Sequence, residues 1–443
     1  METKAFDVIV VGGGTAGTAA CISAAKAGAK TLVVEQLGSL GGTQSNGWVT
    51  PMMPNYLGQF KLDRGINLDL IAAQNALQPS GPDVDHGDVW YDPTMMAMVM
   101  DRVATQAGVI PLFNSTLTDV KRNGPAIEAI EVVTRSGRFW ISGKAFIDTT
   151  GDGELSALAG AELMGGNEDG VHQPMTLRFK MGNVDIERMR NAYTFWRLSA
   201  PKHLEYGIGE LKEDPILGPY VHEAIKLGIL AEDDLGYFQM FMMNGCPGEI
   251  AFNAPRISDL DPLDPWELSR AYQVGREKIY RIAAFLRRYF VGFEQAFVSG
   301  IAPLMGIRES RRVVGEYVLT AEDHLGLRKF EDAVARNRYP IDIHLKTGID
   351  YRKFPPGEYH EIPYRSLVVK GFNNLWVAGR CLSADFVAQS AVRIQPVCRS
   401  MGEAAGAAAA LCAAKGLAAQ ALPYADLRAH LDLSIPEQVG ASS

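Results

Sequence analysis

Residues 7–17 read DVIVVGGGTAG, an apolar run followed by a Gly-rich segment. Its apolar run predicts a buried strand, and its glycines predict a tight turn into a helix. Gly12 permits the turn, Gly14 lets the backbone approach a pyrophosphate, and Gly17 lets the helix pack closely against the strand. The first turn of such a helix offers unpaired N–H groups and a positive dipole end to phosphates. The stretch therefore predicts the first half of a dinucleotide-binding βαβ unit.

A second strand and an acidic residue complete this unit. The alanine-rich helix is expected to stop at Gly28, and Leu32-Val33-Val34 then predicts a second strand that ends at Glu35. A carboxylate at this position can accept hydrogen bonds from the ribose hydroxyls of an adenosine. A tight turn without a ligand would account for the glycines but not for this terminal Glu. We therefore expect residues 7–35 to bind an adenine dinucleotide.

Length and composition are those of an ordinary globular protein. With 443 residues, 47% of them hydrophobic and 21% charged, the chain is long enough for two or three structural units. Its net charge of -8 gives no basic surface for a nucleic acid, so no nucleic-acid partner is expected.

Three sequence features argue against a metal site, a signal peptide and a membrane span. The five cysteines are scattered without a Cys-x-x-Cys pair, which argues against a zinc site, an iron–sulfur cluster and a redox-active disulfide. The segment before the first strand contains Lys4 and leaves no room for a signal peptide, so we expect a cytoplasmic protein. Residues 404–422 contain Lys415 and Gly416 and are expected to form a buried helix rather than a membrane span.

Turn and capping residues place several further elements. Asp92-Pro93 predicts the start of a helix that ends at Gly108. Residues 109–113 predict a strand, and residues 117–147 alternate around two hairpin turn signals, which predicts a three-stranded antiparallel meander. Residues 145–153 form a second strand that enters a Gly-rich turn. That turn could face an anion or could simply connect the strand to the next helix.

A change of pattern near residue 164 predicts a second domain, richer in aromatic residues, Met and Pro. Residues 237–243 and 249–253 predict a buried hairpin. Asp264-Pro265-Trp266-Glu267 predicts the capped start of a helix that runs to about residue 290. The chain closes with a strand and Gly turn at residues 374–380 and a helix from about Val397.

Two short stretches carry candidate chemical groups. Residues 306–312 read GIRESRR, in which three arginines beside one Glu could form an internal salt bridge or an anion-binding site. Residues 341–344 alternate as a strand and end at His344, and a histidine in such a strand is more often structural than catalytic. Both alternatives for residues 306–312 stay open at this point.

Together these motifs resemble the FAD-dependent oxidoreductase family that is distantly similar to the flavoprotein subunits of succinate dehydrogenase and fumarate reductase. The resemblance covers almost the whole chain, in order. It rests on residues 12–17 with Glu35, and on residues 41–43, 148–153 with 157–161, 306–312, 364–367, 378–381 and 401–406.

The resemblance implies an α/β fold in which a Rossmann-like FAD-binding domain of the glutathione-reductase type carries an inserted α+β substrate or cap domain. It implies residues 1–163 and 346–443 for the two parts of the FAD-binding domain and residues 164–345 for the inserted domain. The implied cofactor is FAD. The residues implied to bind it are Gly12, Gly14, Thr15, Ala16, Gly17, Glu35, Gln36, Gly42, Thr43, Leu117, Thr150, Gly151, Gly379, Arg380, Ile394, Pro396 and Val397.

Two departures from the family pattern matter. Fumarate reductases have Gln-x-His-Pro-Thr after the second Gly-rich turn, whereas residues 171–176 of this chain read VHQPMT. His172 is therefore out of register, which leaves a fumarate-type dicarboxylate site in doubt. The chain also has no second Gly-x-Gly-x-x-Gly for a nicotinamide nucleotide, so an electron path like that of glutathione reductase is not expected.

The leading hypothesis is a dehydrogenase or oxidase that removes a hydride from a small organic substrate, with oxygen or a protein as the final electron acceptor. Arg308 and Arg311 are the candidates for orienting an anionic or carbonyl-bearing substrate, and His344 and Tyr364 are the candidates for proton transfer. One alternative is a flavin-dependent reductase of an activated C=C bond, fed by NAD(P)H or by a partner. Another is a non-redox nucleotide-binding protein. Nothing in the sequence indicates the oligomeric state.

Overall fold

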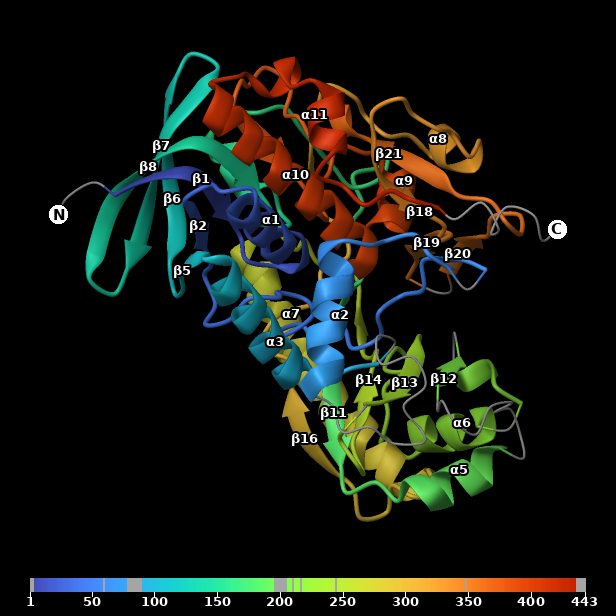
Figure 1. Ribbon diagram of the computed structural model, residues 1–443. Coiled ribbons are helices and arrows are strands. Elements are labelled where there is room, and N and C mark those ends of the chain that lie inside the picture. Colours follow the sequence, from blue (N-terminus) through green and yellow to red (C-terminus); the bar gives the residue numbers. More distant parts are fainter. Residues whose placement is uncertain are drawn as a thin grey trace.

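The computed structural model describes residues 4–58, 60–77, 90–194, 205–208, 211–215, 217–243, 245–346 and 349–435. Figure 1 shows two units, a larger one in the upper part of the view and a smaller one below it. The larger unit contains a seven-stranded mixed sheet, and the smaller unit contains a five-stranded antiparallel sheet. The predicted α/β class with a second domain is confirmed.

The large sheet brings the carboxyl ends of several parallel strands to one edge. Its strands are β1 (Ala5–Val11), β2 (Thr31–Val34), β5 (Ile110–Leu112), β6 (Thr116–Asn123), β7 (Ala126–Thr134), β8 (Gly137–Asp148) and β22 (Leu375–Val377). The order is β5-β2-β1-β8-β7-β6, and β22 pairs with β8. The parallel registers align Val11 with Val34 and with Asp148, and Asp148 with Val377. The turns that follow these strands therefore meet at the same edge of the sheet.

The long strand β8 joins the parallel sheet to the predicted meander. Its first half pairs antiparallel with β7, and its second half pairs parallel with β1 and β22. Along β1, Val8 and Val10 face the core that contains the helices, whereas Ile9 and Val11 face the core that contains meander side chains such as Ile130. Burial on both faces explains the continuous apolar run that opens the sequence.

Four helices pack on one side of the large sheet (Figure 1). They are α1 (Thr15–Lys26), α2 (Ile66–Leu77), α3 (Pro93–Ala107) and α10 (Gln395–Lys415). Helix α3 is capped by the side chain of Asp92, as predicted. Helices α1 and α10 are in direct backbone contact, because a Cβ on Gly406 would lie 2.1 Å from the carbonyl oxygen of Ala20. A Cβ on Gly402 would lie equally close to the carbonyl oxygen of Ala16.

The smaller unit has its own sheet and its own core. Its strand order is β12-β13-β14-β11-β16. Its main elements are β11 (Phe179–Gly182), α5 (Ile186–Thr194), β12 (Glu205–Ile208), α6 (Gly218–Lys226), β13 (Phe238–Met242), β14 (Ile250–Phe252), α7 (Pro265–Tyr289) and β16 (Phe297–Ile301). The predicted hairpin is β13 with β14, and Asp264 caps α7 by accepting hydrogen bonds from backbone N–H groups. Both predictions are confirmed.

The second core ends earlier along the chain than the expected boundary at residue 345. Its buried side chains run from Met175 to Met305, whereas Leu319, Val334 and Ala335 pack in the core of the larger unit. The chain crosses between the units at β9 (Leu163–Gly165) and β17 (Arg311–Val313), which pair with each other.

The remaining elements are short. They are β3 (Tyr56–Leu57), β4 (Phe60–Lys61), α4 (Glu154–Leu158), β10 (Met175–Thr176), β15 (Arg256–Ile257), α8 (Ala321–Leu325), β18 (Ala333–Asn337), β19 (Ile341–His344), β20 (Ile349–Arg352), β21 (His360–Pro363), α9 (Phe386–Val392) and α11 (Tyr424–Arg428), with 3₁₀ turns at Leu211–Glu213, Tyr364–Ser366 and Ala419–Ala421.

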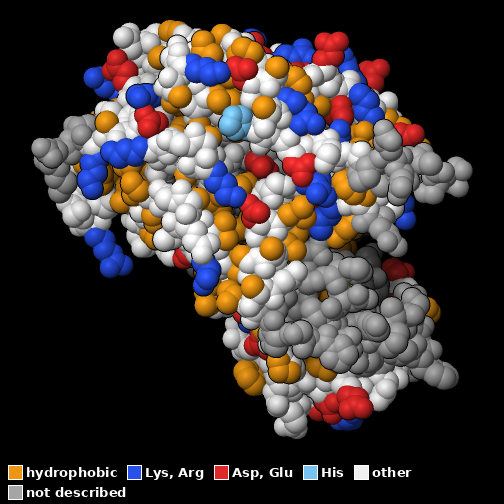
Figure 2. Space-filling model, viewed as in Figure 1, with side chains coloured by type: hydrophobic (Ala, Val, Ile, Leu, Met, Phe, Trp, Pro, Cys, Tyr) orange, Lys and Arg blue, Asp and Glu red, His pale blue; other side chains and the backbone are white. Residues whose placement is uncertain are grey.

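None of the helices among the described residues combines the length and the hydrophobicity that a membrane span needs. Most of the alanine-rich stretch predicted to be buried lies in α10, where the alanines between residues 404 and 410 are buried. On the face shown in Figure 2, the Lys and Arg side chains of the described residues are interspersed with Asp and Glu and form no continuous basic area.

Candidate active site

One cavity connects the carboxyl edge of the large sheet with the smaller unit. Its volume is about 1700 Å³, part of which is open to solvent. It is lined by residues from both units. The expected FAD-binding residues that line it are Gly12, Gly14, Thr15, Ala16, Glu35, Gln36, Gly42, Thr43, Leu117, Thr150, Gly151, Gly379, Arg380 and Ile394. The parallel registers bring these separate segments of the chain together.

Three expected FAD-binding residues do not line the cavity. Gly17 packs α1 on β1, because a Cβ there would lie 1.8 Å from the carbonyl oxygen of Gly12. Pro396-Val397 is buried in the first turn of α10, and residues 394–395 reach the cavity instead. These three residues therefore support the site rather than face it.

The first Gly-rich turn has room for the diphosphate of FAD. Helix α1 begins at Thr15, and no side chain caps its first turn, so N–H groups beside the cavity are left for an anion. Gly14 is not crowded by protein atoms, since the nearest atom to an added Cβ would lie at van der Waals distance, 3.9 Å away. Gly42 has φ +51°, and a Cβ there would lie 2.8 Å from the Cα of Gly14. The residues present fit the cofactor.

Backbone N–H groups hold both carboxylate oxygens of Glu35 in position. Oε2 accepts a hydrogen bond from the N–H of Gly13 and Oε1 accepts one from the N–H of Leu37, each at 2.7 Å. Burial raises the pKa of Glu35, and these N–H groups oppose the rise. Each oxygen keeps acceptor capacity for a ribose hydroxyl.

The second Gly-rich turn is held by Asp148. One carboxylate oxygen of Asp148 accepts hydrogen bonds from the N–H and hydroxyl of Thr150, and the other accepts from the N–H and hydroxyl of Ser156. Thr150 and Gly151 line the cavity. The turn is therefore a hydrogen-bonded connection between β8 and α4 whose tip also faces the cavity.

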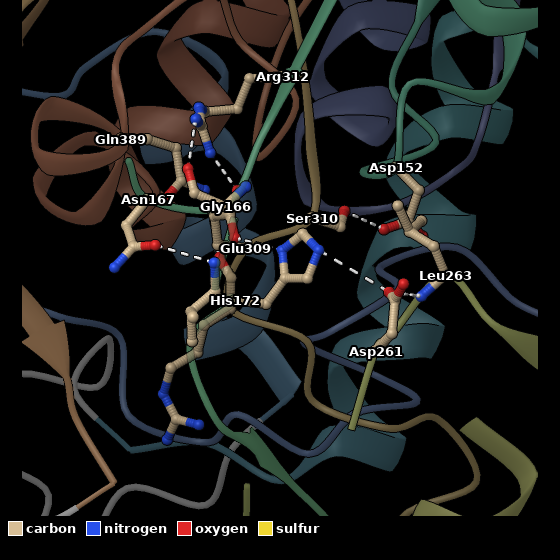
Figure 3. Close-up of polar contacts among 12 residues, drawn as sticks. Asp152, Gly166, Asn167, His172, Asp261, Leu263, Glu309, Ser310, Arg312 and Gln389 are labelled. Atoms are coloured by element: carbon tan, nitrogen blue, oxygen red, sulfur yellow. Dashed lines mark hydrogen bonds and ion pairs between the residues drawn. The ribbon is translucent and has the colours of Figure 1, made fainter. Parts of the chain in front are cut away.

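Residues 306–312 divide between an internal ion pair and the cavity. The fully buried carboxylate of Glu309 accepts hydrogen bonds from Arg312, from the N–H of Gly166 at 3.0 Å and from Nδ1 of His172 at 2.8 Å (Figure 3). The hydrogen bond to Glu309 raises the pKa of His172. Arg312 therefore forms the internal salt bridge that the charge pattern allowed.

The same segment is tied to the second Gly-rich turn through Ser310. The hydroxyl of Ser310 donates a hydrogen bond to Asp152 (Figure 3). Nη1 of Arg380 lies 2.8 Å from Asp152 Oδ1 and 2.8 Å from Ser310 Oγ. Arg380, which lines the cavity, is thus an ion-paired side chain with a fixed position.

Arg308 lines the cavity and Arg311 does not. Nη1 of Arg308 donates to the carbonyl oxygen of Pro174 at 2.6 Å and to Thr176 Oγ1 at 2.8 Å. Burial, together with neighbouring guanidinium groups, lowers the pKa of Arg308 well below its usual value. Of the two arginines expected to orient a substrate, Arg308 lines the cavity, and Arg311 lies in the β17–β9 pairing.

Strand β19 and the residues before it supply three polar side chains to the cavity, Tyr339, Asp342 and His344. Nη2 of Arg256 lies 2.8 Å from Nδ1 of His344. An arginine can only donate, so Nδ1 accepts and the ring proton is on Nε2, which lies 3.4 Å from Asp342 Oδ1. The hydroxyl of Tyr339 donates to Asp342 Oδ2 at 3.3 Å.

These contacts set the charges of Asp342 and His344. Burial, assisted by Arg308, lowers the pKa of His344 to about 3, so its imidazole is neutral at pH 7. Burial alone would raise the pKa of Asp342, but His344, Arg393 and Arg308 hold that pKa well below its usual range. The cavity therefore holds an ionised carboxylate beside a neutral histidine.

Tyr364, expected as a proton-transfer group, lies outside the cavity lining. Its hydroxyl donates to the carbonyl oxygen of Ala419 at 3.0 Å and accepts from Nε1 of Trp376 at 2.9 Å. The side chain is buried in the core of the larger unit. The expectation that Tyr364 transfers a proton is therefore corrected, because its hydroxyl donates and accepts hydrogen bonds within the core and does not reach the cavity.

The cavity residues that sequence reasoning missed include Arg178, Tyr339, Asp342 and Arg393. Asp342 carried a signal, because it precedes His344 by two residues in a strand and side chains two apart share a face. Arg178 and Arg393 carried none, since they lie singly at the ends of short elements.

Comparison with known proteins identifies the family. A family model described as FAD dependent oxidoreductase matches residues 7–431. No curated protein matches the sequence. Among solved structures, p-nitrophenol 4-monooxygenase from Pseudomonas putida DLL-E4 is 11% identical with a TM-score of 0.49, and the match covers 97% of this chain and 84% of that one. A geranylgeranyl bacteriochlorophyll reductase-like protein from Thermoplasma acidophilum is 14% identical with a TM-score of 0.43, covering 97% of this chain and 83% of that one. A flavin-dependent brominase is 12% identical with a TM-score of 0.48, covering 96% of this chain and 83% of that one.

The assignment rests on the family match, which spans nearly the whole chain, and not on these distant structures. The finer resemblance to succinate dehydrogenase and fumarate reductase flavoproteins stays a prediction. The residues around the cavity fit FAD, and the chain belongs to the FAD-dependent oxidoreductase family, with FAD as its cofactor.

Proposed function

We propose that this oxidoreductase removes a hydride from a C–H bond of a small anionic organic molecule. The observation that supports the proposal is one cavity whose lining includes residues that fit FAD together with Arg308 and Asp342. When bound, FAD supplies a two-electron acceptor. The residues of the protein then have to orient the substrate and to take up its proton.

Arg308 is proposed to bind an acidic group of the substrate. Its two hydrogen bonds, to Pro174 and Thr176, fix the guanidinium where it lines the cavity. A charge in buried surroundings attracts an opposite charge more strongly than an exposed one does. A substrate anion bound to Arg308 would therefore be held in one orientation by a guanidinium group whose own position is fixed by Pro174 and Thr176.

Asp342 is proposed to accept the substrate proton. It is ionised at neutral pH, because the His344 imidazole and neighbouring guanidinium groups lower its pKa, and it lines the cavity. His344 was the candidate from the sequence, but its two ring nitrogens face Arg256 and Asp342. His344 is therefore proposed as a positioning residue for the Asp342 carboxylate.

Replacement of Arg308 tests this proposal. We expect Arg308→Ala to lower kcat/KM by about 100-fold or more, the range seen when a charge-stabilising donor is removed. FAD content should not change, because the side chain of Arg308 contacts Pro174 and Thr176 rather than an expected FAD-binding residue. Arg311→Ala, outside the cavity, is the matched control and should keep native activity. Loss of FAD from Arg308→Ala would place this residue in the cofactor site and contradict the proposal.

A further inference from the structure

Arg178 is a cavity residue that the smaller unit supplies. It lies between β10 and β11, and its neighbours Leu177 and Phe179 are buried in the core of that unit. Its side chain lines the cavity that the expected FAD-binding residues also line. Only 6% of Arg178 is exposed. Burial lowers the pKa of Arg178 to about 10, so its guanidinium group is still charged at pH 7.

The guanidinium group of Arg178 lacks a partner in the described protein. Its Nη1 is buried and has no hydrogen-bond partner among the described residues, and no described carboxylate forms an ion pair with this side chain. Other arginines of the cavity lining are held differently, because Arg308 donates two hydrogen bonds and Arg380 pairs with Asp152. A buried guanidinium without a partner is strongly unfavourable, so Arg178 is suited to meet a negative charge on a bound molecule.

Arg178 lies near the beginning of α10. Its charge acts on Tyr91 and opposes the rise in the pKa of the Tyr91 hydroxyl that burial causes. That hydroxyl lies 2.9 Å from Oε1 of Gln395. Gln395 opens α10, lines the cavity and follows Ile394, one of the expected FAD-binding residues. The positive end of the α10 dipole and the charge of Arg178 therefore act on the same part of the cofactor site.

The flavin ring of FAD is uncharged when oxidised, and two electrons with one proton, the content of a hydride, leave it with one negative charge. We propose that Arg178 compensates this charge on the reduced ring, so that a residue of the smaller unit raises the reduction potential of the cofactor. Charges beside a flavin ring tune its electronics, and attraction between buried charges is strong. A higher potential favours hydride removal from a substrate over the reverse reaction. The inference rests on the proposed function only for this direction of the reaction.

Anaerobic redox titration of the holoenzyme against dyes of known potential tests the proposal without an organic substrate. We expect Arg178→Met to weaken the binding of reduced FAD at least about tenfold relative to oxidised FAD, which lowers the midpoint potential by about 30 mV for a two-electron couple. Arg178→Lys keeps the charge and should have a potential between the two. Arg287→Met, at an exposed arginine of α7, is the matched control and should have the native potential. An unchanged potential in Arg178→Met would overturn the proposal.

Two further measurements separate this role of Arg178 from a structural one. The affinity for oxidised FAD should be the same in the native protein and in Arg178→Met, because the oxidised ring carries no charge to compensate. Equal weakening of oxidised and reduced FAD would overturn the proposal. The pH dependence of the native midpoint potential near pH 7 should show uptake of one proton with two electrons, because the guanidinium group opposes protonation of the anionic ring. Uptake of two protons by the native protein would overturn the proposal even if Arg178→Met failed to fold.

This inference and the proposed function fail in different ways. A potential that depends on Arg178, in a holoenzyme that no organic acid reduces, would support the inference and count against the proposed function. Flavin reduction by an organic acid, in a protein whose potential is unchanged in Arg178→Met, would support the proposed function and overturn the inference.

Discussion

At the scale of single residues, the proposed chemistry depends most on Asp342. Asp342→Asn keeps the size of the side chain and removes its charge. We expect kcat to fall by about 10²- to 10⁴-fold, the range typical of a positioned general base. FAD content should stay at the native level, because Asp342 contacts Tyr339, His344 and Arg393 rather than an expected FAD-binding residue. The measurements are steady-state kinetics and the visible spectrum; unchanged kcat would rule out Asp342 as the proton acceptor.

The sequence predicted some residues of the site and missed others. Glu35 was predicted because its role belongs to a local motif, and the structure places its carboxylate against the first Gly-rich turn. Arg308 was found through an unusual charge density, but the sequence did not show that Arg312 would pair with Glu309 while Arg308 faced the cavity. Arg178 could not be found in this way, because its distinguishing feature is a buried Nη1 without a hydrogen-bond partner among the described residues, which only the structure reveals.

Among the helices and strands, the contact between α1 and α10 leaves no room for additional side-chain atoms. A Cβ on Gly406 would lie 2.1 Å from the backbone of Ala20, so Gly406→Ala forces the two helices apart. We expect a loss of about 1–3 kcal/mol in the free energy of unfolding, as for overpacked cores. FAD affinity should also fall, because the N-terminus of α1 lines the cofactor site.

Urea unfolding with and without FAD measures both effects. Gly236→Ala is the control, since an added Cβ there meets nothing within 4 Å, and its stability should lie within about 0.5 kcal/mol of native. Native stability in Gly406→Ala would contradict the close contact.

Helix α8 and strand β21 hold a buried histidine pair. Nδ1 of His324 lies 2.9 Å from Nε2 of His360. Burial lowers the pKa of His324 to about 3 and that of His360 well below its usual value. Below the unfolded pKa of about 6.5, the unfolded chain binds protons that the folded protein does not, so stability falls as pH decreases.

We therefore expect the free energy of unfolding to decrease between pH 7 and pH 5, by up to about 1.4 kcal/mol per pH unit for each of the two histidines. His344 acts in the same direction, and His172, whose pKa is raised by Glu309, acts in the opposite direction. Replacing the exposed His222 by Gln should leave the slope unchanged. A stability that stays constant or rises over this range would show that the pair is not buried and neutral.

At the scale of the whole molecule, the sequence predicted the larger unit better than its relation to the smaller one. The strand, turn and helix of residues 7–35 were predictable because each signal is local, and the meander was predictable from its turns. The return of residues 319–339 to the larger core was not, because it depends on packing against distant segments such as α10. The cavity was predictable only as a cofactor site, since its substrate end combines residues from both units.

If FAD in this protein accepts a hydride from a small anionic molecule, such a molecule must reduce the flavin. The visible flavin spectrum of the purified holoenzyme under anaerobic conditions tests this, first with NADH or NADPH and then with a panel of hydroxy acids, dicarboxylic acids, amines and alcohols. We expect that an organic acid bleaches the flavin band, that its uncharged amide does not, and that neither nicotinamide does. Bleaching by NADH or NADPH with no effect of any acid would rule out this proposal and indicate a reductase that works in the opposite direction.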